Sequence, residues 1–139
     1  MNIEKLHGTE ARLYELVAPL VMSIPILRQN NNYPFKTSEN HTWFVALEDN
    51  EVVGFMPVED KGTSICIDNY YTRGENNELL SQLIAQVVKE FKDAKKTLYA
   101  VAHMPHAELF RKQKFVTKIE WKLYVKMTYQ PNAKSKKRV

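Results

Sequence analysis

Residues 63–102 read TSICIDNYYTRGENNELLSQLIAQVVKEFKDAKKTLYAVA, and this stretch decides the fold. Between Leu79 and Phe91 it carries apolar pairs every four residues, which is the spacing of one buried helix face. Residues 63–69 and 97–102 predict strands, and the second is almost wholly apolar, as in a sheet covered on both faces. Because a helix that returns to a neighbouring strand makes a parallel crossover, the stretch predicts a parallel strand–helix–strand step.

The residues before this stretch predict an antiparallel meander. Residues 42–47 and 52–58 are rich in aromatic and β-branched side chains and flank a polar turn, and residues 63–69 add the third strand. Further upstream, residues 2–7 predict a short strand. A helix face follows it, formed by Leu13, Leu16, Val17, Leu20 and Val21. Pro19 should kink that helix or split it in two.

The residues after the central strand predict one short helix and one last strand. Pro105 suits the first turn of a helix that ends near Gln113. From Ile119 to Met127 apolar and polar residues alternate, which predicts a single half-buried strand. The expected fold class is therefore α/β, as an α+β mixed sheet in which an antiparallel meander precedes a parallel βαβ step.

The composition fits a single domain over residues 1–130. The chain has 139 residues, of which 44% are apolar and 26% charged, so it can bury a core without disulfides or metals. Its one cysteine, Cys66, excludes an intramolecular disulfide and a cysteine zinc cluster. The sequence shows neither a secretory signal nor a membrane-spanning run, so we expect a cytoplasmic protein.

The net charge of +4 comes from the last residues of the chain. Without Lys134, Lys136, Lys137 and Arg138, the chain has 16 basic and 16 acidic side chains. By charge count the body is therefore not a basic nucleic-acid platform, and this count does not exclude a local basic patch. We expect residues 131–139 to form a basic, flexible tail, which is the one feature that suggests a nucleic-acid partner.

Residues 71–76 stand where a phosphate-binding loop would meet the long helix. A helix N-terminus behind a glycine presents bare backbone N–H groups to phosphate. With the element order, this loop makes residues 9–127 resemble the GNAT superfamily of acyl-CoA-dependent N-acyltransferases. The family's loop reads Arg or Gln, two residues, Gly, one residue, then Gly or Ala. Gly74 matches its first glycine, whereas Tyr71 and Asn76 replace the first and last residues of the pattern.

The resemblance implies a sheet that splays open between its fourth and fifth strands, with acetyl-CoA lying in the splay as co-substrate. It implies that the fourth strand and the loop bind this cofactor. The residues expected to do so are Ile67, Tyr71, Arg73, Gly74, Glu75, Asn76 and Asn77. Glu75 and Glu78 work against anion binding at this position.

A second pattern of the family follows its fifth strand. Members often carry an Asn there and, seven residues later, a Tyr before a Gly-Phe pair. In this chain those positions read His103, Phe110 and Lys114-Phe115, so the apolar framework is kept. In the family that tyrosine often protonates the departing CoA thiolate, and Phe110 has no proton to give.

Three side chains are candidates for catalysis. Acyl transfer from a thioester to an amine needs a base, a donor for the oxyanion and, in some cases, an acid for the thiolate. Asp68 and Glu59, near the ends of two predicted strands, are the candidate bases. His103 ends the central strand, where ligands bind in open α/β sheets. The ordinary pKa of an imidazole lies near physiological pH, which suits proton transfer. No metal is expected, because no acidic or thiol partner accompanies His103 and His106 at ligand spacing.

The sequence therefore predicts an N-acetyltransferase that moves an acetyl group from acetyl-CoA to a primary amine on a small molecule or a protein, with no membrane partner. The alternative is a catalytically inactive GNAT-like binding or regulatory domain, associated with nucleic acid through its basic tail. The departures at Tyr71, Asn76 and Phe110 motivate this alternative. The acceptor depends on the early helices and the loop of residues 30–41, whose sequence does not identify it.

Overall fold

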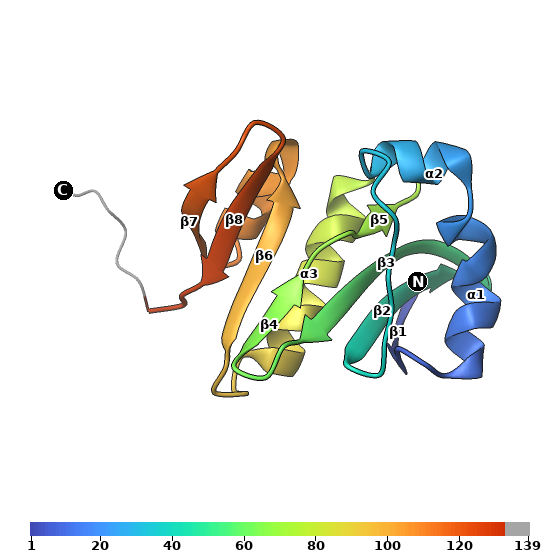
Figure 1. The fold of residues 1–139 in the computed structure, drawn as a ribbon, viewed down its shortest axis with the longest axis horizontal. Helices are drawn as coiled ribbons and strands as arrows, with labels where there is room; N and C mark the ends of the chain where they lie inside the picture. The colour runs from blue at the N-terminus through green and yellow to red at the C-terminus, as the bar shows by residue number, and fades with distance from the viewer. Residues whose placement is uncertain (133–139) are drawn as a thin grey trace.

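The computed structural model describes residues 1–132 and arranges them as one mixed sheet with helices on both faces (Figure 1). The strands are β1 (Asn2–His7), β2 (His41–Glu48), β3 (Glu51–Asp60), β4 (Ser64–Ile67), β5 (Tyr71–Thr72), β6 (Thr97–His103), β7 (Phe115–Glu120) and β8 (Tyr124–Tyr129). The helices are α1 (Ala11–Val21), α2 (Ile24–Gln29), α3 (Asn77–Phe91) and α4 (Ala107–Arg111), with a 3₁₀ turn η1 (Met104–His106). The strand order is β1-β2-β3-β4-β6-β8-β7, and β5 pairs with β3 outside this path.

The parallel step predicted from residues 63–102 is confirmed. β4 and β6 pair in parallel, with Ile65 opposite Leu98 and Ile67 opposite Ala100. α3 connects them and buries one apolar face, made of Leu79, Leu80, Leu83, Ile84 and Val87. The antiparallel meander is confirmed as well, since β2 pairs antiparallel with β3, and β3 with β4. Together these pairings give the expected mixed sheet.

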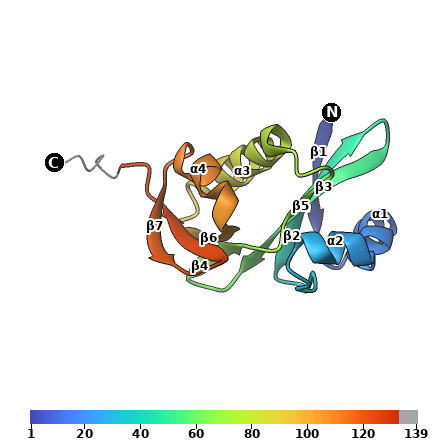
Figure 2. The ribbon, with the colours of Figure 1, turned by 90° about the horizontal axis from the view of Figure 1, so that it is seen from above.

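Helices pack on both faces of the sheet, and part of one face stays uncovered. Seen from above, α3 and α4 lie on one face, and α1 and α2 lie on the other face over β1 to β3 (Figure 2). The first core lies under α3 and α4 and includes Phe44, Ile67 and Phe110. The second core lies under α1 and includes Leu13 and Phe55. Within residues 1–132, no helix covers the face of β4, β6 and β8 that lies opposite α3 (Figure 2).

The prediction of one last strand over residues 119–127 is wrong, because the chain forms an antiparallel hairpin there. β7 and β8 pair with each other, and the backbone N–H of Trp121 donates to the carbonyl oxygen of Tyr124 at 2.8 Å to close the turn. Ile119, Trp121 and Leu123 remain 45%, 47% and 53% exposed. The apolar alternation therefore runs through a turn whose apolar side chains face solvent.

Two other boundaries differ from the sequence-based expectation. α1 continues through Pro19 to Val21, and the break that separates it from α2 comes at Met22 and Ser23. β4 ends at Ile67 rather than at residue 69, because Asn69 adopts a φ of +53° that an extended strand does not allow.

The predicted basic tail lies outside the described residues except for Pro131 and Asn132, which form a turn. In the part of the chain that the structure describes, no helix is long and apolar enough to cross a membrane.

Gly8 fixes the loop of residues 30–41 to the end of β1. Its backbone N–H donates to the carbonyl oxygen of His41 at 2.9 Å, and the Thr37 hydroxyl donates to the Gly8 carbonyl oxygen at 2.7 Å. A Cβ on Gly8 would overlap the backbone carbonyl oxygen of Ser38. The space at this position therefore admits only glycine.

We predict that Gly8→Ala lowers the free energy of unfolding by about 3 kcal/mol or more, because backbone atoms must move to admit the methyl group. Gly62→Ala is the matched control, since nothing lies within 4 Å of a Cβ there and only its φ of +96° opposes the change. Thermal unfolding should show a fall in Tm of roughly 10 °C for Gly8→Ala. A loss no greater than that of Gly62→Ala would contradict the packing described for this loop.

Candidate functional site

β4 and β6 part immediately after Ile67. Their pairing ends at Ile67 and Ala100, whereas β6 continues to His103, paired with β8. The segment that follows β4 crosses to β3 after Asn69, and there Thr72 of β5 pairs with Gly54 of β3. The sheet therefore splays between β4 and β6, as the sequence resemblance implies.

The side chain of Tyr70 lies inside this splay. Tyr70 is 5% exposed, and its hydroxyl oxygen accepts from the backbone N–H of His103 at 2.9 Å. The same hydroxyl shares a hydrogen bond of 2.8 Å with Nδ1 of His106. Its ring packs against Phe110, with the ring centroids 6.0 Å apart. Burial raises the pKa of Tyr70 far above its ordinary value, so the hydroxyl is protonated at neutral pH.

Asn30 bridges the two sides of the splay. Its amide is only 2% exposed, and one N–H donates to Oδ1 of Asn69 at 3.1 Å on the β4 side. Its Oδ1 accepts from Nε2 of His103 at 3.0 Å on the β6 side. The second amide N–H donates to the carbonyl oxygen of Tyr33 at 2.9 Å. Both donors and the acceptor of the buried amide are therefore paired, which makes the bridge a stable element.

The splay leaves little free space between its two sides. A cavity of about 20 Å³ remains, close to the space that a single water requires. Gln29, Tyr70, Tyr71, Thr72, Glu75, His103 and His106 line it. An acyl-CoA arm does not fit here unless Tyr70 and Asn30 move.

His103 is neutral at physiological pH. Burial, helped by the neighbouring His106, lowers the pKa of His103 to about 4. Because its Nε2 donates to Asn30, the ring carries its proton on that nitrogen and holds it in the bridge. This arrangement leaves His103 without a proton to offer a leaving group at neutral pH.

The loop before α3 contributes few groups that could hold phosphate. Tyr71 is 7% exposed, and its ring packs against Phe55 with the ring centroids 5.3 Å apart. Its side chain therefore points into the core, and only its backbone could contact a phosphate. Ile67 is fully buried. The Asn76 side chain accepts from the N–H of Leu79, which occupies one donor of the helix N-terminus.

The exposed part of the same loop is a turn. Gly74 has a φ of +69°, the left-handed conformation that glycine adopts without strain, and open space surrounds its Cα. Glu75 and Asn77 are exposed at the same end of α3. Arg73 extends toward Glu51 on β3, at 3.5 Å, and lines a pocket with Glu48. The same pocket is lined by Asn76, Glu78 and Leu79 at the start of α3, so Arg73 lies beside the helix N-terminus while its guanidinium pairs with Glu51.

A larger pocket lies on the open face of the sheet, where β4 ends. It has a volume of about 450 Å³, and Asp68 and Glu59 line it together with His41. Burial raises the pKa of the Asp68 carboxyl above its ordinary value. A carboxylate with a raised pKa is a better proton acceptor than an exposed one, so Asp68 is suited to take a proton from an amine.

The structure therefore brings together two of the three predicted catalytic side chains. Asp68 and Glu59 line the pocket on the open face, whereas His103 lines the small cavity and is tied to Asn30. Sequence reasoning did not consider Asn30, and it offered Tyr70 only as one of three possible hydroxyl donors, beside Tyr71 and Tyr99. Neither lies at a spacing that marks a function, since the partners of Asn30 are 39 and 73 residues away in the sequence. Within residues 1–132, no group of three His, Cys, Asp or Glu side chains could hold a metal ion.

Comparison with solved structures identifies the fold. ElaA from Escherichia coli superposes with a TM-score of 0.76 at 12% identity, over 94% of this chain and 100% of that one. An acyl-CoA N-acyltransferase from Pseudomonas aeruginosa gives 0.75 at 15% identity, with the same coverage. A GNAT family acetyltransferase from Elizabethkingia anophelis with acetyl-CoA bound gives 0.58 at 15% identity, over 91% of this chain and 94% of that one.

The chain has the GNAT fold. No protein-family model and no curated protein matches its sequence. The similarity to GNAT proteins therefore lies in the order and pairing of the helices and strands.

The depressed pKa of His103 predicts a pH dependence of stability. Between about pH 6.5, the ordinary value for the unfolded chain, and pH 4, the unfolded state binds a proton that the folded state does not. This difference lowers the free energy of unfolding as the pH falls, by up to about 1.4 kcal/mol per pH unit for one proton.

We predict that His103→Gln, which keeps a donor for Asn30, flattens the dependence of unfolding free energy on pH between 6.5 and 4. Urea unfolding at several pH values measures both proteins, and the values at pH 7.5, where the imidazole is neutral in both states, isolate the pH-independent loss. Equal slopes in the two proteins would mean that His103 is not held neutral.

Proposed function

We propose that this chain is an N-acyltransferase that moves an acetyl group from acetyl-CoA to a primary amine. One observation carries the proposal: the carboxyl of Asp68, with its raised pKa, lies where β4 and β6 part and lines a pocket open to solvent. The GNAT fold supports the acyl-CoA co-substrate, since a similar structure has acetyl-CoA bound. A cytoplasmic location, which suits this chemistry, stays a prediction.

In the proposed reaction the amine attacks the thioester carbonyl directly. Its lone pair forms the C–N bond, and the carbonyl oxygen becomes an oxyanion that a backbone N–H near the end of β4 would stabilise. Asp68 takes the proton that the nitrogen loses, and Glu59 in the same pocket is the alternative acceptor. The C–S bond then breaks, and the electron pair leaves with sulfur as the CoA thiolate.

The thiolate leaves without a strong acid. Phe110 has no proton, and His103 is neutral at physiological pH with its proton held by Asn30. Tyr70 is close to Phe110, but its raised pKa makes proton transfer to a thiolate unfavourable, since a thiol has a pKa of about 8.5. A leaving group of this acidity can depart and take its proton from solvent.

Acetyl-CoA must displace Tyr70 and the Asn30 bridge to enter the splay. Each hydrogen bond given up costs about 1 kcal/mol when ligand or water does not replace it. The observed affinity for acetyl-CoA is then reduced by the small population in which the splay is open. We expect acetyl-CoA to bind weakly unless the acceptor or its own contacts repay this cost.

A second candidate function is a GNAT-fold binding domain that performs no acyl transfer. The filled splay favours it, because about 20 Å³ of cavity leaves no space for a cofactor arm in the described conformation. The carboxylates beside the α3 N-terminus favour it as well. Whether such a domain would contact nucleic acid depends on the basic residues beyond residue 132, outside the described residues, and salt-dependent binding would test it.

We predict that Asp68→Asn lowers acetyl transfer to a panel of primary amines by about a hundredfold or more, because the amide cannot accept the proton. The KM for acetyl-CoA should stay unchanged, since Asp68 is not placed to hold the cofactor. Glu59→Gln, a carboxylate in the same pocket, is the matched control and should lose less than about tenfold. Release of free CoA thiol measures each rate.

Tyr70→Ala separates the two candidate functions. If acetyl-CoA enters the splay, removing the ring should tighten its binding, despite a loss of stability of about 3–5 kcal/mol for a large buried aromatic residue. Isothermal titration at a temperature where both proteins are folded measures the change. No transfer by the wild type, with no binding of millimolar acetyl-CoA by either protein, would reject the enzyme and leave the binding domain.

A further inference from the structure

Four charged side chains share the pocket on the open face. Lys36 and Lys61 line it along with Asp68 and Glu59. Among residues 1–132, none of the four is within 4.0 Å of an opposite charge in an ion pair. Lys36 lies 5.7 Å from the centre of the Tyr33 ring, and Lys61 donates to the Tyr99 hydroxyl at 3.2 Å. The pocket thus offers both signs of charge without neutralising either.

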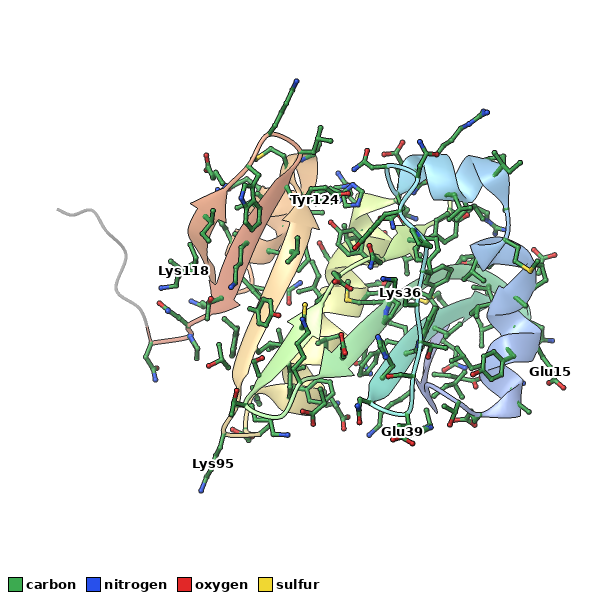
Figure 3. All side chains as sticks on the ribbon, viewed as in Figure 1. Glu15, Lys36, Glu39, Lys95, Lys118 and Tyr124 are labelled. Atoms are coloured by element: carbon green, nitrogen blue, oxygen red, sulfur yellow. The ribbon has the colours of Figure 1, made fainter. Side chains whose placement is uncertain are left out.

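The two lysines come from different segments of the chain. Lys36 lies on the loop that crosses in front of the sheet between α2 and β2, as Figure 3 shows. Lys61 lies in the turn between β3 and β4. Both lower the pKa of Asp68 through their charge, although burial raises it by more, so both ammonium groups act on the same carboxyl. A ligand in this pocket would meet positive charge and the carboxylate together.

An apolar pocket adjoins the charged one. Its volume is about 310 Å³, and it shares Tyr33, Asp68 and Asn69 with the charged pocket. Its other walls are mainly Val101, Leu123 and Tyr124. Figure 3 shows Tyr124 at the start of β8, where its hydroxyl accepts from the Asn31 amide at 3.0 Å. Asp68 is therefore the point at which an apolar pocket and a charged pocket meet.

We infer that the acceptor is a zwitterionic amine of the α-amino-acid class, with a carboxylate beside its amine and an apolar side chain. In this arrangement the amine lies at Asp68, the carboxylate between Lys36 and Lys61, and the side chain against Leu123 and Tyr124. The inference rests on the proposed function in naming the ligand an acceptor, whereas the recognition itself rests only on the two pockets.

Other amines fit this surface less well. A polyamine or the side chain of a protein lysine could pair with Asp68 and Glu59, but it would leave the Lys36 and Lys61 ammonium groups without a negative partner. An amine without an apolar group would leave the wall of Leu123, which is 53% exposed, in contact with water. A ligand that carries both charges and an apolar group can pair its amine with Asp68 and its carboxylate with the two lysines, while its apolar group covers the apolar wall.

Titration calorimetry of the full chain without acetyl-CoA tests the recognition directly. The probes are leucine, leucinamide, which lacks the carboxylate, and N-acetylleucine, which lacks the basic amine. We expect leucine to bind at least tenfold more tightly than either analogue. In Lys36→Gln/Lys61→Gln the preference for leucine over leucinamide should disappear, and Asp68→Asn should remove the preference over N-acetylleucine.

Lys126→Gln is the matched control, since Lys126 lies 4.9 Å from the Tyr99 ring but lines neither pocket. It should bind all three probes as the wild type does. Equal binding of the probes, or loss of the preference in Lys126→Gln alone, would overturn the inference, even if acetyl transfer to another amine is observed. Selective leucine binding without any acetyl transfer would support the recognition and reject the proposed function instead.

Discussion

The hydrogen bonds that Tyr70 and Asn30 make across the gap between β4 and β6 hold the site together. The Tyr70 hydroxyl accepts from the His103 backbone, and the Asn30 amide joins Asn69 to the His103 ring. These bonds replace strand pairing after the β4–β6 ladder ends, so they satisfy buried polar groups that would otherwise be orphaned. They also attach the end of α2 and the loop after it to the sheet, and that loop forms one wall of both pockets on the open face.

The two halves of the proposed site are unequally developed in this chain. On the cofactor side, Tyr70 fills the splay, Asn76 caps α3 with its own side chain, and Phe110 offers no proton. On the open face, the Asp68 carboxyl lies in a solvent-accessible pocket with charges of both signs around it. The proposed acyl transfer therefore requires that the contacts of bound acetyl-CoA contribute more free energy than the hydrogen bonds that close the splay.

The sequence predicted the order of most helices and strands, because each of these elements has a local apolar periodicity. The apolar pairs from Leu79 to Phe91 are enough to predict α3, and the apolar run 97–102 places β6 inside the sheet. The same reasoning failed at residues 119–127, because exposed Ile119, Trp121 and Leu123 continue an alternation through a turn. Periodicity reports where apolar residues recur and cannot distinguish a half-buried strand from a hairpin with apolar residues at its tip.

The site was less predictable, since it depends on contacts between distant residues. The sequence suggested Asp68 and Glu59 because each lies near a predicted strand end, and they share a pocket because β4 is short: Glu59 pairs with Cys66, two residues before Asp68. The sequence did not predict the closure of the splay. The hydrogen bonds that close it join residues separated by 33, 39 and 73 positions in the sequence, and their polar side chains have no distinctive spacing.

Hydrogen exchange at the backbone amide of His103, followed by NMR, tests the closure of the splay most directly. In the free protein this N–H donates to the Tyr70 hydroxyl, so we expect it to exchange about a hundredfold or more slowly than in an unfolded chain. Saturating acetyl-CoA should speed its exchange while the amides in the β4–β6 ladder remain protected. Rapid exchange in the free protein, or unchanged protection of this amide under conditions of acetyl transfer, would contradict the account.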